Sequence, residues 1–213
     1  MSGPGDGSRE YFDRVAEDWD AMRTGFFGPA VRDRAIAAAG AAPGGIAADI
    51  GAGSGFLTEA LLAAGLRVVA VDRSERMLEA LRKRLGAPAG LELRRGDAGA
   101  LPLESGSCDA VFANMYVHHV ERPAGALAEM ARLLRPGGRL AVTDLEAHDH
   151  EWLREEHHDR WLGFDTEAFA GWLRDAGLQD ARVEPLGQQC TARSCGGRSA
   201  SVAIFLATGT APR

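Results

Sequence analysis

The sequence has few cysteines and almost no lysine. Its 213 residues include three cysteines, too few for a disulfide scaffold, and Lys83 is the only lysine. Because arginine and alanine are abundant, we attribute the scarcity of lysine to genome composition rather than to function. No apolar run approaches the roughly 18 residues of a membrane-spanning helix, and residues 1–8 lack the apolar core of a secretory signal. These absences predict a cytoplasmic protein with no membrane partner.

Positive charge is also in short supply. The chain has 24 basic and 30 acidic residues, a net charge of −6, which argues against broad binding to nucleic acid or to membrane surfaces. The length favours one domain with a sizeable core. We expect a disordered tail over residues 1–8 and a single domain over 9–213. Within this domain, N-terminal helices (9–45) precede a cofactor-binding half (46–145) and a substrate-side half (146–213).

The stretch from Ala47 to Thr58 organises the chain. A short apolar run ends in an acid, glycines follow at every second position, and a helical pattern of apolar residues comes next. This order predicts a strand, a tight loop and a helix. Glycine permits positive φ and lets a ligand lie against the main chain, while the helix directs free amide groups at the loop. We therefore expect a nucleotide-type cofactor to bind at Asp49, Gly51, Ala52, Gly53 and Gly55.

Spacing distinguishes between cofactor classes. The dinucleotide fingerprint needs its third glycine three places after the second, where this chain has Phe56. Asp49 would repel a pyrophosphate but would attract an ammonium group, and S-adenosylmethionine carries an ammonium group and no phosphate. The pattern Asp-x-Gly-x-Gly-x-Gly resembles the first motif of the class I S-adenosylmethionine-dependent methyltransferases.

A second acidic residue follows at the end of the next predicted strand, 65–72. Asp72 lies 17 residues after the last loop glycine, near the offset of about 20 residues known for acids that bind a ribose. The alternative is that Asp72 caps the helix predicted over 75–85, a role for which Ser74 is better placed. We therefore expect Asp72 to accept hydrogen bonds from the ribose hydroxyls.

The adenine is expected beside the ends of the second and third strands. The third predicted strand, 91–96, is followed by Asp97 and Ala98. The resemblance implies that an acid at this position meets the adenine amino group, although Gly-Asp-Ala alone would indicate only a turn. With the ribose on the preceding strand, Arg73 and Met77 would flank the same base.

The fourth predicted strand, 108–114, ends in a segment with two histidines, from Asn114 to His119. This segment lacks the Asn-Pro-Pro-aromatic box of enzymes that methylate amino groups of nucleic acids, and is more similar to small-molecule methyltransferases. Asn114 is then expected at the cofactor. A helix over 123–134, the turn Pro-Gly-Gly and a fifth strand over 139–144 follow in an order common in the family.

The resemblance implies an α/β fold with three layers. We expect a Rossmann-like sheet of seven mostly parallel strands with an antiparallel last strand, and helices on both faces. The sixth and seventh strands are predicted at 181–189 and 201–208, where apolar residues recur between turn signals.

Residues 9–39 have a helical pattern that is interrupted at Gly25 and again near Pro29. In many family members an N-terminal helix also covers the cofactor. Tyr11 and Phe12 are therefore candidate lid residues, with Tyr11 a candidate cofactor contact, whereas Trp19 is expected to pack on the sheet.

Two segments of the substrate half combine histidine and cysteine. His148 and His150 follow the fifth strand, and Cys190 and Cys195 follow the sixth in what we predict to be a flexible polar loop. Because both segments should rise at the carboxyl edge of the sheet, the four side chains are candidate ligands for a soft metal or metalloid, or contacts for a thiol-reactive substrate. The spacing matches no standard zinc pattern, and arsenite methyltransferases use more thiols than these two.

A structural role is the alternative for these residues. His148 and His150 would then be turn and cap residues, and the cysteines an adventitious pair. His157 and His158 would lie solvated on a charged helix, which the pattern predicts over 152–162.

Methyl transfer from a sulfonium is an in-line displacement, in which the enzyme orients the partners and excludes water. An acceptor that carries a proton also needs a base. Histidine titrates near neutral pH, so the candidate catalytic residues are His118, His148, His150 and Asp144, with His119 and Tyr116 as further candidates. A thiolate or a metalloid lone pair would need no base.

We interpret the chain as an enzyme that transfers a methyl group from S-adenosylmethionine to a small molecule. It resembles the ubiquinone-biosynthesis-like branch, including methyltransferase domains fused to metalloregulators, through Tyr-Phe-Asp at 11–13 and through residues 144–163. The alternatives are a metal- or metalloid-directed methyltransferase, a nicotinamide-dependent oxidoreductase, which Asp49 and Phe56 disfavour, and a cofactor-binding protein without catalysis. Neither the acceptor nor the oligomeric state follows from the sequence.

Overall fold

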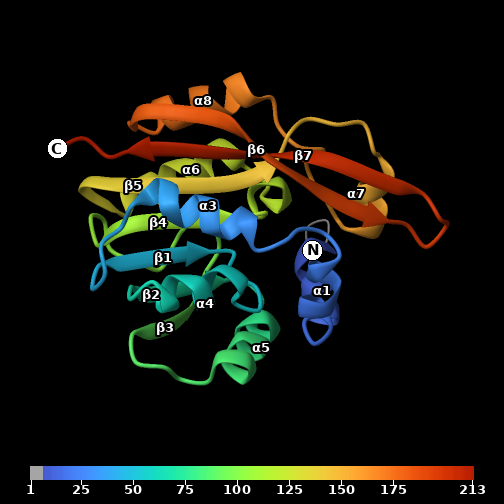
Figure 1. Ribbon diagram of the computed structural model, residues 1–213, viewed down its shortest axis with the longest axis horizontal. Coiled ribbons are helices and arrows are strands. Elements are labelled where there is room, and N and C mark those ends of the chain that lie inside the picture. Colours follow the sequence, from blue (N-terminus) through green and yellow to red (C-terminus); the bar gives the residue numbers. More distant parts are fainter. Residues whose placement is uncertain (1–6) are drawn as a thin grey trace, which may run out of the picture.

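A seven-stranded sheet forms the centre of the computed structural model, which describes residues 7–213 (Figure 1). The strands are β1 (Ile46–Ile50), β2 (Arg67–Asp72), β3 (Leu91–Arg95), β4 (Cys108–Asn114), β5 (Leu134–Leu145), β6 (Gln179–Arg193) and β7 (Ser199–Thr210). Their order in the sheet is β3-β2-β1-β4-β5-β7-β6. The first five pair in parallel, and β7 runs antiparallel to both β5 and β6. The expected fold class is confirmed.

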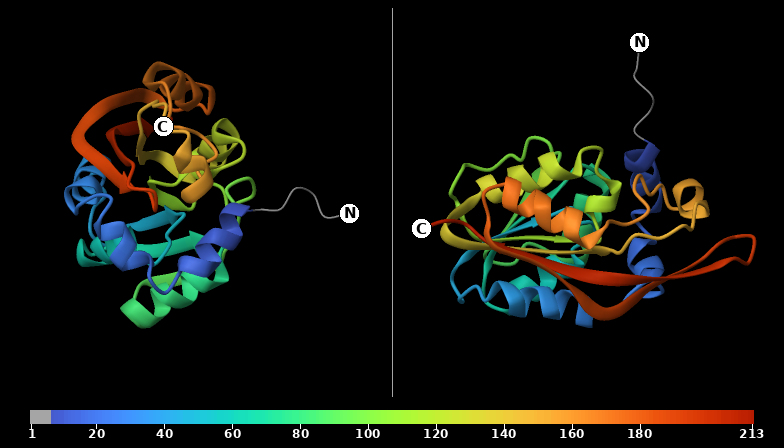
Figure 2. Two further views of the ribbon diagram at one scale, coloured as in Figure 1. Left: turned by 90° about the vertical axis from the view of Figure 1, so that its right-hand side faces the viewer. Right: turned by 90° about the horizontal axis from the view of Figure 1, so that it is seen from above.

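Helices cover both faces of the sheet. They are α1 (Gly7–Val15), α2 (Trp19–Thr24), α3 (Ala30–Ala39), α4 (Phe56–Ala63), α5 (Glu75–Leu85), α6 (Pro123–Arg132), α7 (Trp152–Glu156) and α8 (Thr166–Asp175), with a 3₁₀ turn, η1 (Val117–His119), after β4. One core joins the sheet to α3 and α4, and the other joins it to α6 and α8 (Figure 2). Burial on both faces explains why β1 and β4 are almost wholly apolar.

Local signals explain where several elements begin. Ser74 caps α5, as expected, because its hydroxyl accepts a hydrogen bond from the Met77 N–H at 3.0 Å. Asp165 caps α8 through the Ala168 N–H at 2.8 Å.

Among residues 7–213, no helix combines the length and the apolar character that crossing a bilayer would require.

The N-terminal region departs from the expectation in two places. Gly7 and Ser8, expected in the tail, are the first residues of α1, while the rest of the expected tail lies outside the described residues. The helical region also breaks earlier than predicted, at residues 16–18, so that α1 and α2 are separate. The apolar face continues across this turn, which is why periodicity alone did not detect it.

The structure of the substrate half (146–213) differs more from the prediction. The helix predicted over 152–162 ends at Glu156, because His158 adopts a left-handed φ of +58°. The segment predicted as a flexible loop is largely strand: Cys190 pairs with Val202 in a long β6–β7 hairpin, whose turn lies at 194–198. Together with α1 and α7, this hairpin extends beyond the carboxyl ends of the parallel strands (Figure 1).

Candidate active site

The glycine loop follows β1 and bends sharply. Gly51, Gly53 and Gly55 have φ values of +71°, +52° and +90°, a region that side chains disfavour. A Cβ on Gly51 would stand 2.2 Å from the ring of Tyr116, and one on Gly55 would stand 2.8 Å from Leu81. Glycine is therefore required at both positions, by backbone conformation and by space.

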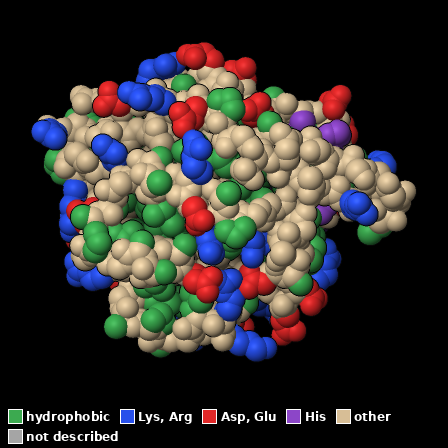
Figure 3. Space-filling model, viewed as in Figure 1, with side chains coloured by type: hydrophobic (Ala, Val, Ile, Leu, Met, Phe, Trp, Pro, Cys, Tyr) green, Lys and Arg blue, Asp and Glu red, His purple; other side chains and the backbone are tan. Residues whose placement is uncertain are grey.

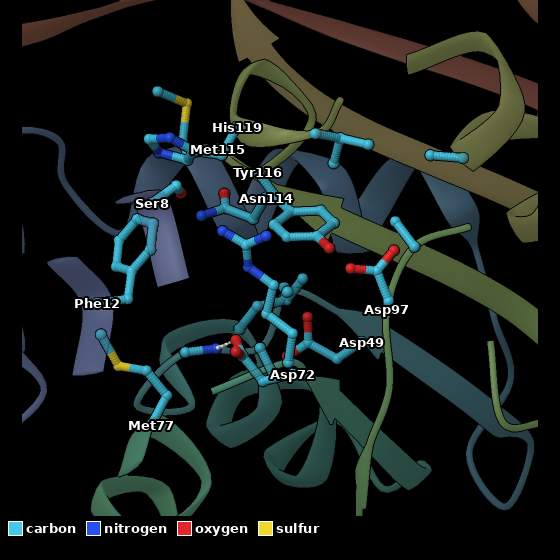
Figure 4. Close-up of a pocket in the computed structure, with 18 of the residues that line it drawn as sticks. Ser8, Phe12, Asp49, Asp72, Met77, Asp97, Asn114, Met115, Tyr116 and His119 are labelled. Carbon is cyan, nitrogen blue, oxygen red and sulfur yellow. Dashed lines mark hydrogen bonds between the residues drawn. The ribbon is translucent and has the colours of Figure 1, made fainter. Parts of the chain in front are cut away.

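Asp72 holds this loop to the end of β2. Its Oδ2 accepts a hydrogen bond from the Gly53 N–H at 2.9 Å, and its Oδ1 accepts one from the Ser74 N–H at 2.8 Å. Burial raises the pKa of the carboxyl, although these hydrogen bonds oppose the shift. Helix α5 is capped by Ser74 and not by Asp72. The Asp72 carboxylate lies at the cavity wall (Figure 4).

Asp49 is buried deeper, at 1% exposure. Its Oδ2 accepts a hydrogen bond from the Thr58 hydroxyl at 2.6 Å. Burial raises the pKa of Asp49 to about 7, and the nearby charge of Asp72 contributes to the increase. Two acidic residues on adjacent strands therefore face one cavity.

This outer cavity has a volume of about 430 Å³ and lies at the carboxyl edge of β1, β2 and β4. Figure 4 shows three carboxylates, an asparagine and an aromatic ring directed into it from different strand ends. Ten of the expected cofactor residues line it: Asp49, Gly51, Ala52, Gly53, Asp72, Arg73, Met77, Asp97, Ala98 and Asn114. The sequence thus predicted most of this wall.

Two expected cofactor residues do not line the outer cavity. Gly55 supports the loop from behind, against Leu81, and Tyr11 lines a second, inner cavity instead. From the same helix α1, Phe12 lines both cavities, as does Trp19, for which we expected only packing. Because helix α1 is amphipathic, periodicity identified its apolar face but not which residue of that face meets which cavity.

Ser8 also lines the outer cavity, although we expected it in a disordered tail. Its Oγ is buried and makes no hydrogen bond with the described residues. The chain around the cavity thus offers carboxylates at three strand ends, a bare glycine backbone and an unused hydroxyl. This set fits a ligand with an ammonium group and ribose hydroxyls, as S-adenosylmethionine has.

Helices α1 and α2 are tied to the cofactor side of the sheet. Ser74 donates a hydrogen bond to Asp13 at 2.5 Å, and Ser54 in the glycine loop donates one to Asp20 at 2.8 Å. Arg84 pairs with the same Asp20 carboxylate at 2.9 Å. These contacts hold the N-terminal helices at the edge of the cavity, which Phe12 and Trp19 line.

The inner cavity, of about 60 Å³, adjoins the outer one, and His119 lines both. Aromatic rings from the N-terminal helices form one side, and a group of polar residues forms the other. His118 is central to that group: its Nδ1 lies 2.7 Å from Asp144 Oδ1. The other oxygen of Asp144 accepts a hydrogen bond from the Val117 N–H at 2.8 Å, which fixes the carboxylate.

Asp159 completes this polar group. One of its oxygens lies 3.9 Å from His118 Nε2 and 3.9 Å from His119 Nδ1. The sequence did not identify Asp159 because it falls within the predicted helix. In the structure it follows the early end of α7, and the left-handed turn at His158 directs the chain back to the cavity.

The pKa values in this group reflect burial and mutual charge. Burial alone would lower the pKa of His118, but the Asp144 carboxylate raises it to about 9. Burial and the neighbouring His118 hold the pKa of His119 well below its usual range. Burial raises the pKa of Asp159 to about 6 and that of the Cys190 thiol to about 12.

The metal site expected from the sequence does not assemble. His148 and His150 lie together, with ring centroids 5.4 Å apart, but line neither cavity. Cys190 lines the inner cavity, whereas Cys195 is exposed in the hairpin turn, where its N–H donates to Glu156. The strand pairing of β6 separates the two thiols, so the four residues form no common ligand set.

The cofactor half of the chain is similar in sequence to known proteins. Residues 48–142 match a methyltransferase domain family. A demethylmenaquinone methyltransferase of Clavibacter sepedonicus is 41% identical over 96 residues, which are 45% of this chain and 39% of the relative. The chain spans less than half the length of the first curated relatives it matches.

Solved structures match over nearly the whole chain. A methyltransferase of Haloferax volcanii, solved with the activator Trm112, has a TM-score of 0.75 at 22% identity, covering 95% of this chain and 98% of that one. The [4+2]-cyclase SpnF has the same TM-score at 15% identity, covering 95% and 94%. At these identities the likeness concerns the fold alone. The sequence matches are more specific, and they concern residues 48–142: this part of the chain is similar to a methyltransferase domain and to a demethylmenaquinone methyltransferase.

Proposed function

We propose that this chain transfers a methyl group from S-adenosylmethionine to a small-molecule acceptor. The observation that carries the proposal is the outer cavity, where carboxylates from Asp49, Asp72 and Asp97 surround a bare glycine backbone. When bound, the sulfonium supplies an activated methyl group. The residues of the chain then need to hold the donor, orient the acceptor and exclude water.

The positions of the residues around the outer cavity support a proposed role for each of them. Asp72 is held in place for the ribose by two backbone N–H groups, and Asp97 and Ala98 lie beside the position for the base. Asp49 is placed to meet the ammonium group. The methyl group is then directed toward the segment from Asn114 to His119, and through it to the inner cavity.

We further propose that the acceptor is bound at the junction of the two cavities. Phe12 and His119 line both, so an acceptor there would reach the donor and the polar group around His118. Of the four catalytic candidates, position supports His118, with Asp144 orienting its ring. It does not support His148 and His150, which line neither cavity.

A small acceptor fits the surface better than a nucleic acid does. Acidic and basic side chains are interspersed on the face shown in Figure 3, and the net charge is −6. A protein that binds nucleic acid broadly would instead present a continuous patch of basic side chains.

Calorimetric titration with S-adenosylhomocysteine tests the donor site. The wild type should bind one equivalent, Asp72→Ala should lose binding, and the control Glu75→Ala, at an exposed residue of the neighbouring helix, should keep it. A wild type that fails to bind would overturn the proposal, and NADH fluorescence titration would then test the nicotinamide alternative. The wild type could instead bind S-adenosylhomocysteine but transfer no labelled methyl group to any acceptor in a screen. That result would favour a non-catalytic role or chemistry such as that of the cyclase.

A further inference from the structure

His118, His119 and Asp159 form a compact group of potential metal ligands. One ligand atom from each lies within 4.8 Å of the others, and this is the only such group of three or more found in the part of the chain that the structure describes. All three residues are at most 8% exposed. Two ligand atoms bound to one tetrahedral zinc ion lie about 3.3 Å apart, since each bond is about 2 Å long. Closing the group around an ion therefore needs the ligand atoms to approach one another by about 1.5 Å or less.

We infer that His118, His119 and Asp159 bind a divalent first-row transition metal ion at the junction of the two cavities. Two imidazoles and one carboxylate make a borderline nitrogen and oxygen set that suits zinc, cobalt or iron(II). The site is distinct from the one expected from His148, His150 and the two cysteines of the hairpin.

The contacts around His118 are those of a metal-ligating histidine. Asp144 Oδ1 lies 2.7 Å from Nδ1, so this nitrogen carries the proton and Nε2 is the atom directed at Asp159. Asp144 is itself held by the N–H groups of Val117 at 2.8 Å and Leu145 at 2.8 Å. Carboxylates that orient a ligating imidazole in this way are common second partners of metal sites.

Charge also favours a cation. Asp144 and Asp159 are both buried, and each reaches the same imidazole from opposite ring nitrogens. Two carboxylates and two neutral imidazoles carry a charge of −2, which one divalent ion would balance. Without the ion, this balance depends on protons shared within the group.

Three protein ligands leave at least one coordination position open, which is typical of catalytic rather than structural zinc. His119 borders the outer cavity, so the open position would face the acceptor. If the chain is a methyltransferase as proposed, this geometry points to an acceptor that carries a hydroxyl or thiol able to bind the metal.

Cobalt titration of the metal-stripped full chain tests the site. One Co²⁺ per chain should bind, give visible d–d bands and be displaced by Zn²⁺. His118→Gln and Asp159→Asn should abolish these bands, and Asp144→Asn should weaken binding by about 10- to 100-fold. The controls His150→Ala and Cys195→Ser should bind as the wild type does. Circular dichroism and S-adenosylhomocysteine affinity would show that each variant is folded.

The outcomes separate the metal site from the proposed function. A wild type that takes up neither Co²⁺ nor Zn²⁺ stoichiometrically refutes the site, as does uptake that His118→Gln leaves intact or Cys195→Ser removes. Failure of the chain to bind S-adenosylhomocysteine refutes the proposed function and the acceptor role, while cobalt binding would still establish the ion site. Cobalt bands that change when a hydroxyl- or thiol-bearing compound is added would support the acceptor class, and bands unchanged by either class would refute it.

Discussion

The buried carboxyl of Asp49 lowers the stability of the fold when it is ionised. Its carboxyl is 1% exposed, and burial raises its pKa from 3.8 to about 7. A shift of about three pH units corresponds to about 4 kcal/mol. The folded chain binds this proton more tightly than the unfolded chain does, so the contribution to stability is present below about pH 4 and is lost as the pH rises to about 7.

Asp49→Asn should therefore stabilise the ligand-free protein at pH 8. The asparagine removes the buried charge, and its carbonyl oxygen can still accept the hydrogen bond from Thr58. We expect the free energy of unfolding to rise by about 2–4 kcal/mol, below the full cost because the amide NH₂ is itself buried. In a chain of this size that corresponds to an increase in Tm of roughly 5–15 °C. Near pH 4, where wild-type Asp49 is protonated, the gain should largely disappear.

Urea unfolding at pH 8 and near pH 4 measures both effects. Asp109→Asn is a matched control, because this carboxylate accepts the Ile46 N–H at 2.7 Å and pairs with Arg135 at 2.9 Å, which hold its pKa below the usual range. The control substitution should destabilise the protein at pH 8. If Asp49→Asn proved no more stable than the wild type at pH 8, or if its gain were the same near pH 4, the argument from desolvation would be refuted.

The same structure predicts three other results. Affinity for S-adenosylhomocysteine should be about tenfold weaker at pH 6 than at pH 8, because the ammonium group needs ionised Asp49, whose pKa is about 7; a calorimetric affinity independent of pH would contradict this. Gly51→Ala should abolish that binding and cost more than the about 1–2 kcal/mol of a left-handed alanine, since its Cβ would meet Tyr116 at 2.2 Å. Gly106→Ala, with φ +66° and open space, should show only the backbone cost and keep the affinity. Among the cysteines, only Cys195 should react rapidly with a thiol reagent before unfolding, as counted by mass spectrometry. Fast labelling of a second thiol would be inconsistent with the burial of Cys108 and with the partial burial and raised thiol pKa of Cys190.

The outer cavity could be predicted because most of the residues that line it lie in short segments at the ends of strands. Asp49 and Asp72 each directly follow an apolar run, so the end of the strand and the side chain are read from the same few residues. The capping role of Ser74 and the position of Asp72 followed from their spacing alone. Parallel strands then bring these ends to one edge, whatever the details of packing.

The inner cavity could not be predicted because distant segments build it. Asp159 reaches it only because α7 ends early, and the left-handed conformation of His158 has no composition signal. Cys190 lies in a strand whose partner is fixed by pairing across the hairpin, while the nearby glycines at 196 and 197 suggested a loop. Side-chain periodicity does not by itself show which segment a strand will pair with.

This division bears on what relatives can say about the acceptor. The family match covers residues 48–142, which supply most of the outer cavity. Of the inner cavity, that region supplies only Met115, His118 and His119. The other lining residues come from the N-terminal region (11–27), from the end of β5 and the segment after it, and from the β6–β7 hairpin. Similarity over the matched region therefore concerns the outer cavity and says little about the residues that line the inner one. The fold by itself does not identify the reaction, since one of the solved structures with this fold is a [4+2]-cyclase.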